Sequence, residues 1–211
     1  MSGPLRLIEL RPSPNNIKVR LGLRLKGCEF ETIPVALDDA ERAEVLRLSG
    51  QPLTPVLLDG DLPVWDSAAI LRHLDTIAPH EPIFFGRTRE RIHEVERWER
   101  WARGVVYDTF TIVPGMAFRG AFDPAEVERA NAEMRRHTAR IEEALADRDY
   151  LLGDAPTAAD LTLVPMVFST MLTEEQAAAS RIAAFLRQHF HLGEERDRTR
   201  AWVERLMAHW H

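Results

Sequence analysis

The hydrophobic pattern of this chain changes near residue 80, and the change limits the folds open to it. Before that point, short strand-like stretches alternate with amphipathic helical stretches in the order β-α-β-α-β-β-α. Beyond it, only helical periodicity continues. We therefore predict a fold of class α/β plus all-α, with an α/β domain over 1–79, a proline- and glycine-containing linker over 80–88 and an all-helical domain over 89–211.

The predicted elements follow from apolar spacing and turn residues. Strands are expected at 5–10 and 29–35, and a hairpin at 55–65 around the turn Asp59-Gly60-Asp61. Helices are expected at 14–27, 38–48, 67–77, 87–118, 124–147, 157–172, 178–191 and 196–210. In the first long helix we predict that Ile92, Val95, Ala102 and Val105 share one buried stripe.

Composition excludes several functions. Lys and Arg number 27 against 33 Asp and Glu, a formal charge of −6, so no basic surplus exists to neutralise a nucleic acid. With Cys28 as the one cysteine, an internal disulfide or a C-x-x-C zinc site is impossible. The histidines lack a metal-site spacing, so we expect no metal. No apolar run approaches a membrane span and the start does not resemble a signal peptide, so we expect a cytoplasmic protein without a membrane partner.

Three short motifs each allow a structural and a functional interpretation. Pro55 opens a strand and removes a backbone N–H there, which is compatible with an ordinary strand start. Asp66-Ser67 stands at the start of the helix expected at 67–77, where either residue could cap the helix or its N–H groups could bind a carboxylate. Ser13 before Pro14 is typical of a helix start, and that helix end also favours a nearby thiolate.

Together these motifs resemble the cytosolic glutathione transferase family. The β-α-β-α-β-β-α order, Pro55 at the third strand, Asp66-Ser67, the loop "SPNNIKVR" and a capping pair of Thr157 and Asp160 occur in the family's order. The loop is similar to those of the bacterial-type branches that use serine or asparagine. The resemblance implies a thioredoxin-like domain followed by a helical domain, glutathione as co-substrate without a metal, and a homodimer.

The resemblance also implies where glutathione lies. A cis Pro55 would turn the backbone of Thr54 towards the glutathione peptide, Asp66 would accept from the γ-glutamyl ammonium, and Ser67 with its helix start would bind the γ-glutamyl carboxylate. Gln51 is a possible partner for the glycyl carboxylate. Ser13, with Asn15 as the alternative, would donate to the thiol.

Lowering a thiol pKa from about 8.5 by two units takes about 2.7 kcal/mol. A helix terminus and one charged hydrogen bond suffice for this.

The second substrate is expected beside the thiol. Tyr107, Phe110, Thr111 and Pro114 fall where the family builds an apolar pocket for a small hydrophobic electrophile, although plain interhelical core is an alternative for them. Two other functions stay open: a different glutathione-dependent reaction, such as disulfide reduction, ether cleavage or isomerisation, and a non-catalytic binding protein.

Overall fold

The computed structural model describes residues 4–10, 13–36 and 39–210, and over them it confirms the predicted order of the first elements. Asp38, the predicted start of the second helix, and the chain ends lie outside these ranges. The α/β part contains β1 (Leu5–Glu9), α1 (Pro14–Leu25), β2 (Phe30–Pro34), α2 (Asp39–Ser49), β3 (Val56–Asp59), β4 (Leu62–Trp65) and α3 (Ser67–Ile77).

The four strands form one mixed sheet in the order β2-β1-β3-β4. β1 runs parallel to β2 and antiparallel to β3, which pairs antiparallel with β4. Because successive side chains along each strand point to opposite sides, the sheet has two apolar faces. Leu7 lies opposite Leu57 in the core that includes α1 and α3, whereas Ile8 lies opposite Val56 in a second cluster with Val45 of α2.

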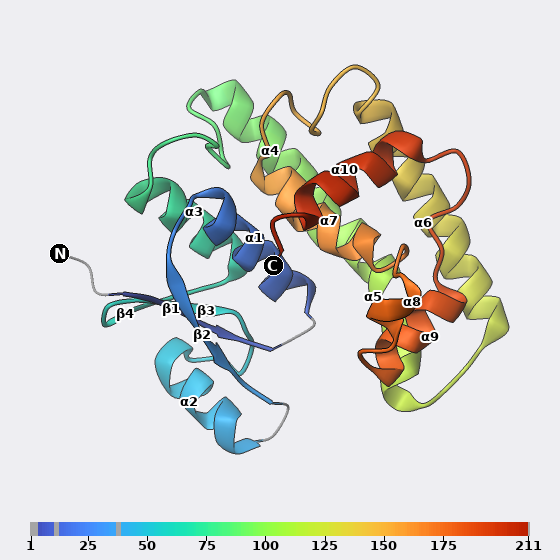
Figure 1. Ribbon diagram of the computed structural model, residues 1–211, viewed down its shortest axis with the longest axis horizontal. Helices are drawn as coiled ribbons and strands as arrows, with labels where there is room; N and C mark the ends of the chain where they lie inside the picture. Colours follow the sequence, from blue (N-terminus) through green and yellow to red (C-terminus); the bar gives the residue numbers. More distant parts are fainter. Residues whose placement is uncertain (1–3, 11–12, 37–38, 211) are drawn as a thin grey trace.

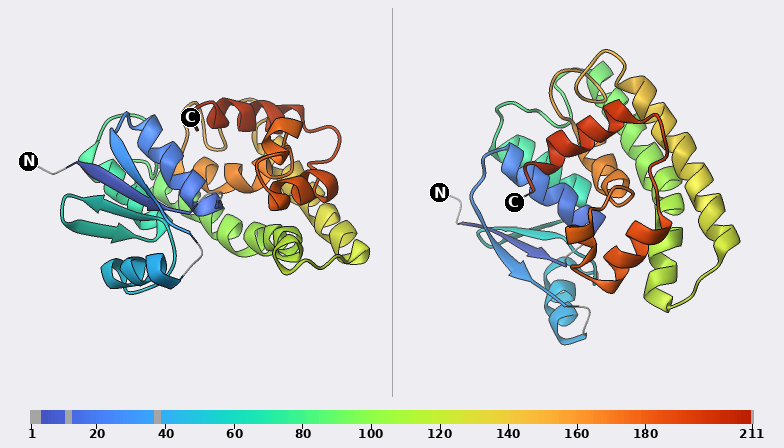
Figure 2. Two further views of the ribbon diagram at one scale, coloured as in Figure 1. Left: turned by 60° about the horizontal axis from the view of Figure 1, so that its bottom comes forward. Right: turned by 45° about the vertical axis from the view of Figure 1, so that its right-hand side comes forward.

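Helices therefore cover both faces of the sheet. α1 and α3 lie on one face and α2 on the other (Figures 1 and 2). α1 and α3 approach closely at Gly22, where an added Cβ would come within 2.5 Å of the Leu71 side chain. This face of the sheet also turns towards the helical part, because α1 packs against α7.

The helical part begins after the predicted linker. It contains α4 (Arg89–Trp101), a π-helical segment η1 (Ala102–Val106), α5 (Tyr107–Arg119), α6 (Pro124–Ala144), α7 (Ala158–Phe168), α8 (Glu174–Ala177), α9 (Arg181–His189) and α10 (Asp197–Met207). α7 is buried on every side from Ala158 to Val167, as expected of a central helix. The predicted Thr157–Asp160 capping pair is confirmed, and Asp160 also accepts from the indole of Trp202 at 2.9 Å.

The predicted single helix over 87–118 was wrong in its middle. The segment 102–106 is π-helical and lies between α4 and α5, so the side chains that follow it point in other directions than in an uninterrupted α-helix. Val105, predicted to be buried, is therefore 50 % exposed, and Val106 is buried in its place. The same segment carries Arg103 to the face that meets the α/β part.

Candidate functional site

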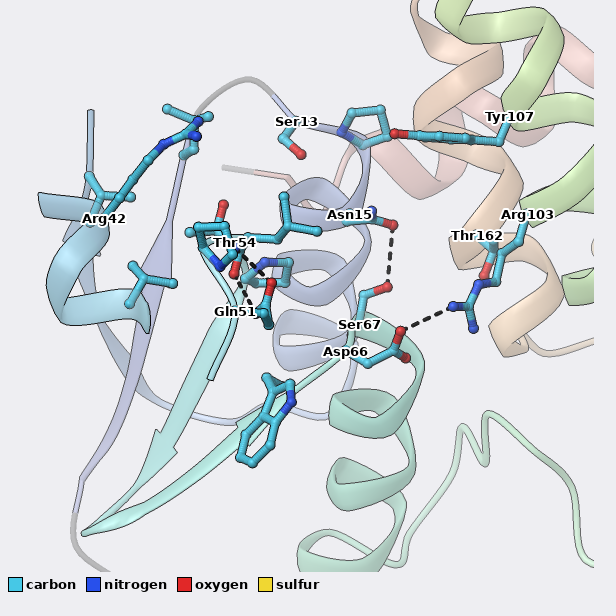
Figure 3. Close-up of a pocket in the computed structure, with 18 of the residues that line it drawn as sticks. Ser13, Asn15, Arg42, Gln51, Thr54, Asp66, Ser67, Arg103, Tyr107 and Thr162 are labelled. Carbon is cyan, nitrogen blue, oxygen red and sulfur yellow. Dashed lines mark hydrogen bonds and ion pairs between the residues drawn. The ribbon is translucent and has the colours of Figure 1, made fainter. Parts of the chain in front are cut away.

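A cavity of about 520 Å³ lies where the α/β part meets the helical part. Its walls include most of the predicted site residues: Ser13, Asn15, Gln51, Thr54, Pro55, Asp66, Ser67 and Tyr107. These come from the start of α1, the loop before β3, the start of α3 and the start of α5 (Figure 3). The fold thus brings together residues that are separated by up to ninety-four positions in the chain, from Ser13 to Tyr107.

The start of α1 presents an unused hydroxyl to the cavity. Ser13 occupies the N-cap position with extended backbone angles, and Pro14 follows as the first helical residue. The helix start expected at Ser13-Pro14 is therefore confirmed, but the Ser13 side chain makes no capping hydrogen bond to the helix. Within the described residues its hydroxyl has no partner, and it is free to donate to a ligand beside the positive end of the helix.

Asn15, the alternative donor, is already engaged on one side. Its Oδ1 accepts from Ser67 Oγ at 3.2 Å, which ties the start of α1 to the start of α3. This contact fixes the amide and leaves its Nδ2 without a partner among the described residues. Both donors therefore line the cavity, and the geometry leaves each able to reach a bound group.

A side-chain hydrogen bond connects the loop before β3 to α1. The Thr54–Pro55 bond is cis, the isomer that the family resemblance implied. Asn16, which is fully buried, donates from Nδ2 to Thr54 Oγ1 at 3.1 Å. Between described residues, no hydrogen bond uses the backbone N–H or C=O of Thr54. Thr54 is thus held in place by its side chain while its backbone remains available at the cavity wall.

Asp66 forms a cap and an ion pair at once. Its Oδ1 accepts from the N–H groups of Ala68 and Ala69 at 2.9 and 3.2 Å, and its Oδ2 accepts from Arg103 Nη2 at 3.1 Å. The backbone of Asp66 has φ of 65°, a conformation that costs a non-glycine residue about 1–3 kcal/mol. Partial burial raises the pKa of Asp66, but the Arg103 charge and the two backbone donors outweigh it, so the carboxylate stays ionised.

The predicted role of Gln51 does not fit its contacts. Its Nε2 donates to Ser49 Oγ and to the Leu53 carbonyl, and its Oε1 accepts from the Leu53 N–H at 2.7 Å. These bonds use the amide to shape the loop. The cation at this end of the cavity is Arg42 of α2, which has no hydrogen bond or ion pair to another described residue.

Most of the predicted second-substrate residues lie away from the cavity. Tyr107 lines it and is 39 % exposed. Phe110 instead packs in the core against Phe190, with ring centroids 6.4 Å apart, and Pro114 is buried. Thr111 is exposed and donates to the Asp108 carbonyl. The helix phase set by the π-helical segment turns these three residues from the cavity, so the core alternative holds for Phe110 and Pro114.

Sequence reasoning missed Arg42 and Arg103, as well as Thr162 and Met166 of α7, which also line the cavity. Both arginines lie in charge-rich helices, where no local pattern distinguishes them. Behind the wall, Glu99 accepts from Lys18 Nζ at 3.1 Å and from Thr162 Oγ1 at 3.3 Å. This buried network joins α1 to α4 and α7, one turn from Arg103.

Two negative findings concern the described part of the chain. No group of three or more His, Cys, Asp or Glu side chains in it is placed to hold a metal ion. None of its helices combines the length and apolar character that crossing a membrane requires.

A thioredoxin-like sheet followed by a helical part, with a cavity where the two meet, is the architecture of the glutathione transferase fold. Family models agree with this fold: "Glutathione S-transferase, N-terminal domain" matches residues 12–77, and "Glutathione S-transferase, C-terminal domain" matches residues 124–205. The structure resembles that of poplar glutathione transferase F1 with a TM-score of 0.75 at 16 % identity, covering 99 % of this chain and 95 % of that one.

Sequence relatives agree with the family models. Glutathione S-transferase 4 of Zea mays is 31 % identical over 173 residues, which cover 78 % of this chain and 77 % of the relative. Glutathione S-transferase F10 of Arabidopsis thaliana is 28 % identical over 193 residues, covering 87 % and 83 %. The chain belongs to the glutathione S-transferase family.

Proposed function

We propose that the cavity binds glutathione, lowers the pKa of its thiol at the start of α1 and directs the thiolate to a hydrophobic electrophile. As a family member the protein is a glutathione-dependent transferase, with glutathione as its co-substrate. One observation carries the assignment to this cavity. Arg42 and Arg103 line its opposite sides, with Ser13, Asn15 and Thr54 between them (Figure 3). Glutathione has the matching order: a carboxylate at each end and a thiol between them.

Each part of the tripeptide then has a partner. The glycyl carboxylate points to Arg42, the cysteinyl backbone pairs with the free N–H and C=O of Thr54, and the γ-glutamyl group lies at Asp66 and Ser67. At the start of α3, Asp66 already accepts from the N–H groups of Ala68 and Ala69, and the Ser67 hydroxyl donates to Asn15. The backbone N–H of Ser67, which has no partner among the described residues, remains for a carboxylate. This arrangement places the thiol at Ser13, whose hydroxyl has no other partner in the described chain.

The transfer step follows from this placement. The thiol proton leaves to solvent, and the Ser13 hydroxyl and the positive end of α1 stabilise the remaining thiolate. The sulfur forms a bond to the electrophilic carbon, whose leaving group departs with its electron pair. Tyr107 and Met166 supply apolar surface beside this point, which suits a hydrophobic electrophile.

The experiment is a pair of measurements on the whole protein. Calorimetry with S-methylglutathione, which cannot react, tests binding, and turnover with glutathione and an activated aryl halide tests transfer. Binding with turnover supports the proposal. Binding without turnover favours another glutathione-dependent reaction, and no binding favours a non-catalytic protein.

We also propose that the protein removes hydrophobic electrophiles in the cytoplasm and that 1–79 and 89–211 are its two domains.

We propose further that two copies of the chain associate. Association is supported by Leu53 and Trp65 at the cavity rim, which are 67 % and 44 % exposed. The mixed charges of 87–103 and the helix from Ser67 offer further surface. Light scattering at micromolar concentration tests association, and a monomer mass would contradict it.

A further inference from the structure

One end of the cavity is formed by α2 and by the chain that follows β2. Val35 lines it after β2, and Arg42 and Val45 line it from α2. Arg42 and Val45 are three positions apart, which places both side chains on the same side of the helix. Figure 3 shows Arg42 and Ser67 on opposite sides of Thr54. We call this region the α2 end of the cavity.

The α2 end combines one cation with an apolar surface. Val35 and Val45 belong to the apolar cluster on the α2 face of the sheet, which also contains Ile8 of β1. Leu10, which follows β1, lines the cavity as well. Arg42 has no hydrogen bond or ion pair to another described residue. A ligand that reaches this end therefore meets a guanidinium group beside side-chain carbon.

Glutathione would leave much of this apolar surface without a contact. Its third residue is glycine, whose carboxylate can pair with Arg42 but which has no side chain to reach Val35 or Val45. Each CH₂ group that a ligand buries against such a surface strengthens binding about fourfold. A third residue with a short apolar side chain uses both the cation and the carbon surface.

We propose that the α2 end accepts a third residue larger than glycine, so that the protein prefers γ-glutamyl-cysteinyl thiols whose third residue carries a short apolar side chain and a free carboxylate. This inference rests on the proposed function and names the class of thiol that fits the same cavity. The carboxylate pairs with Arg42, and the side chain lies against Val35 and Val45. The thiol stays at Ser13, because the γ-glutamyl and cysteinyl parts are unchanged.

The test compares three S-methylated tripeptides by calorimetry. They are S-methylglutathione and its two analogues with L-α-aminobutyrate or L-serine in place of glycine. The two replacement side chains have nearly the same size, but one ends in a methyl group and the other in a hydroxyl. Their comparison therefore separates apolar contact from mere space at the α2 end.

The aminobutyryl analogue is expected to bind wild type at least about fourfold more tightly than S-methylglutathione, which corresponds to burying one CH₂ group. The seryl analogue should bind no more tightly than S-methylglutathione, because its hydroxyl loses water against valine side chains without gaining a partner.

Two protein variants locate the contact. Val35→Thr places a hydroxyl in the cavity wall with little change of size, and it should lower the preference for the aminobutyryl over the seryl analogue by about twofold or more. Val105→Thr is the matched control, because Val105 is half exposed and does not line the cavity. It should leave the preference unchanged.

Three outcomes would overturn the inference while leaving glutathione binding intact. The aminobutyryl analogue could bind no more tightly than S-methylglutathione, which means that a side chain gains nothing at the α2 end. The seryl analogue could bind as tightly as the aminobutyryl one, or Val35→Thr could retain the full preference; either result excludes apolar contact with this wall. A wild-type protein that binds none of the ligands overturns the proposed function, and this inference with it.

Discussion

Replacing Ser13 with alanine separates thiol activation from helix capping. A hydrogen bond from the Ser13 hydroxyl to the thiolate should contribute about 1.5–3 kcal/mol. At 1.36 kcal/mol per unit, its loss raises the pKa of the bound thiol by about one to two units. An N-cap alanine substitution usually costs about 1 kcal/mol of folding stability. Because the Ser13 side chain makes no capping bond, we expect Ser13→Ala to change the free energy of unfolding by less than about 0.5 kcal/mol.

The pKa is measured from the ultraviolet absorbance of the thiolate, by titrating the complex with glutathione against pH. Below both pKa values, the rate of transfer should fall by the same factor as the thiolate population. Asn15→Ala is the matched comparison. Since Asn15 Oδ1 is bonded to Ser67, its loss should weaken binding and move the thiol pKa little.

The reasoning fails if Ser13→Ala leaves the thiol pKa unchanged. If Asn15→Ala raises the pKa instead, the amide of Asn15 is the thiol donor. A fall of the melting temperature in Ser13→Ala without a pKa change would mean that Ser13 serves the helix alone.

Four further substitutions test contacts around the site and within the helical part. Asn16→Ala should raise the KM for glutathione, because Thr54 loses its hydrogen bond to α1, and Thr54→Val should have the same effect. An unchanged KM in both variants would mean that this hydrogen bond does not contribute to glutathione binding. Glu99→Gln should cost about 3 kcal/mol in urea unfolding, because it leaves the buried Lys18 without its counter-charge; a loss below about 1 kcal/mol would contradict this. Burial lowers the pKa of His137 in the folded protein below its unfolded value of about 6.5. The stability that neutral His137 contributes is therefore present above pH of about 6.5 and is lost as the pH falls through the lower folded value. Below pH of about 6.5, the melting temperature of wild type should fall more steeply with acidification than that of His137→Gln.

Local patterns in the sequence predicted the elements that hold the site. Ser13-Pro14 starts α1, the turn at Gly60 joins β3 to β4, and Asp66-Ser67 starts α3. Each of these signals acts over a few residues, through backbone angles, missing N–H groups or side chains that reach the next turn. The family resemblance then indicated which of these helix starts meets a ligand.

Only the tertiary structure determined which side chains share the cavity and which are already used. Gln51 has its amide engaged by Ser49 and Leu53, and Phe110 turns into the core. Arg103 reaches Asp66 because a π-helical segment shifts the phase of one helix while the α/β and helical parts pack together. The hydrophobic period of a sequence reports which face of a regular α-helix is buried. A π-helical interruption and the contacts of distant segments depend instead on packing across the whole molecule.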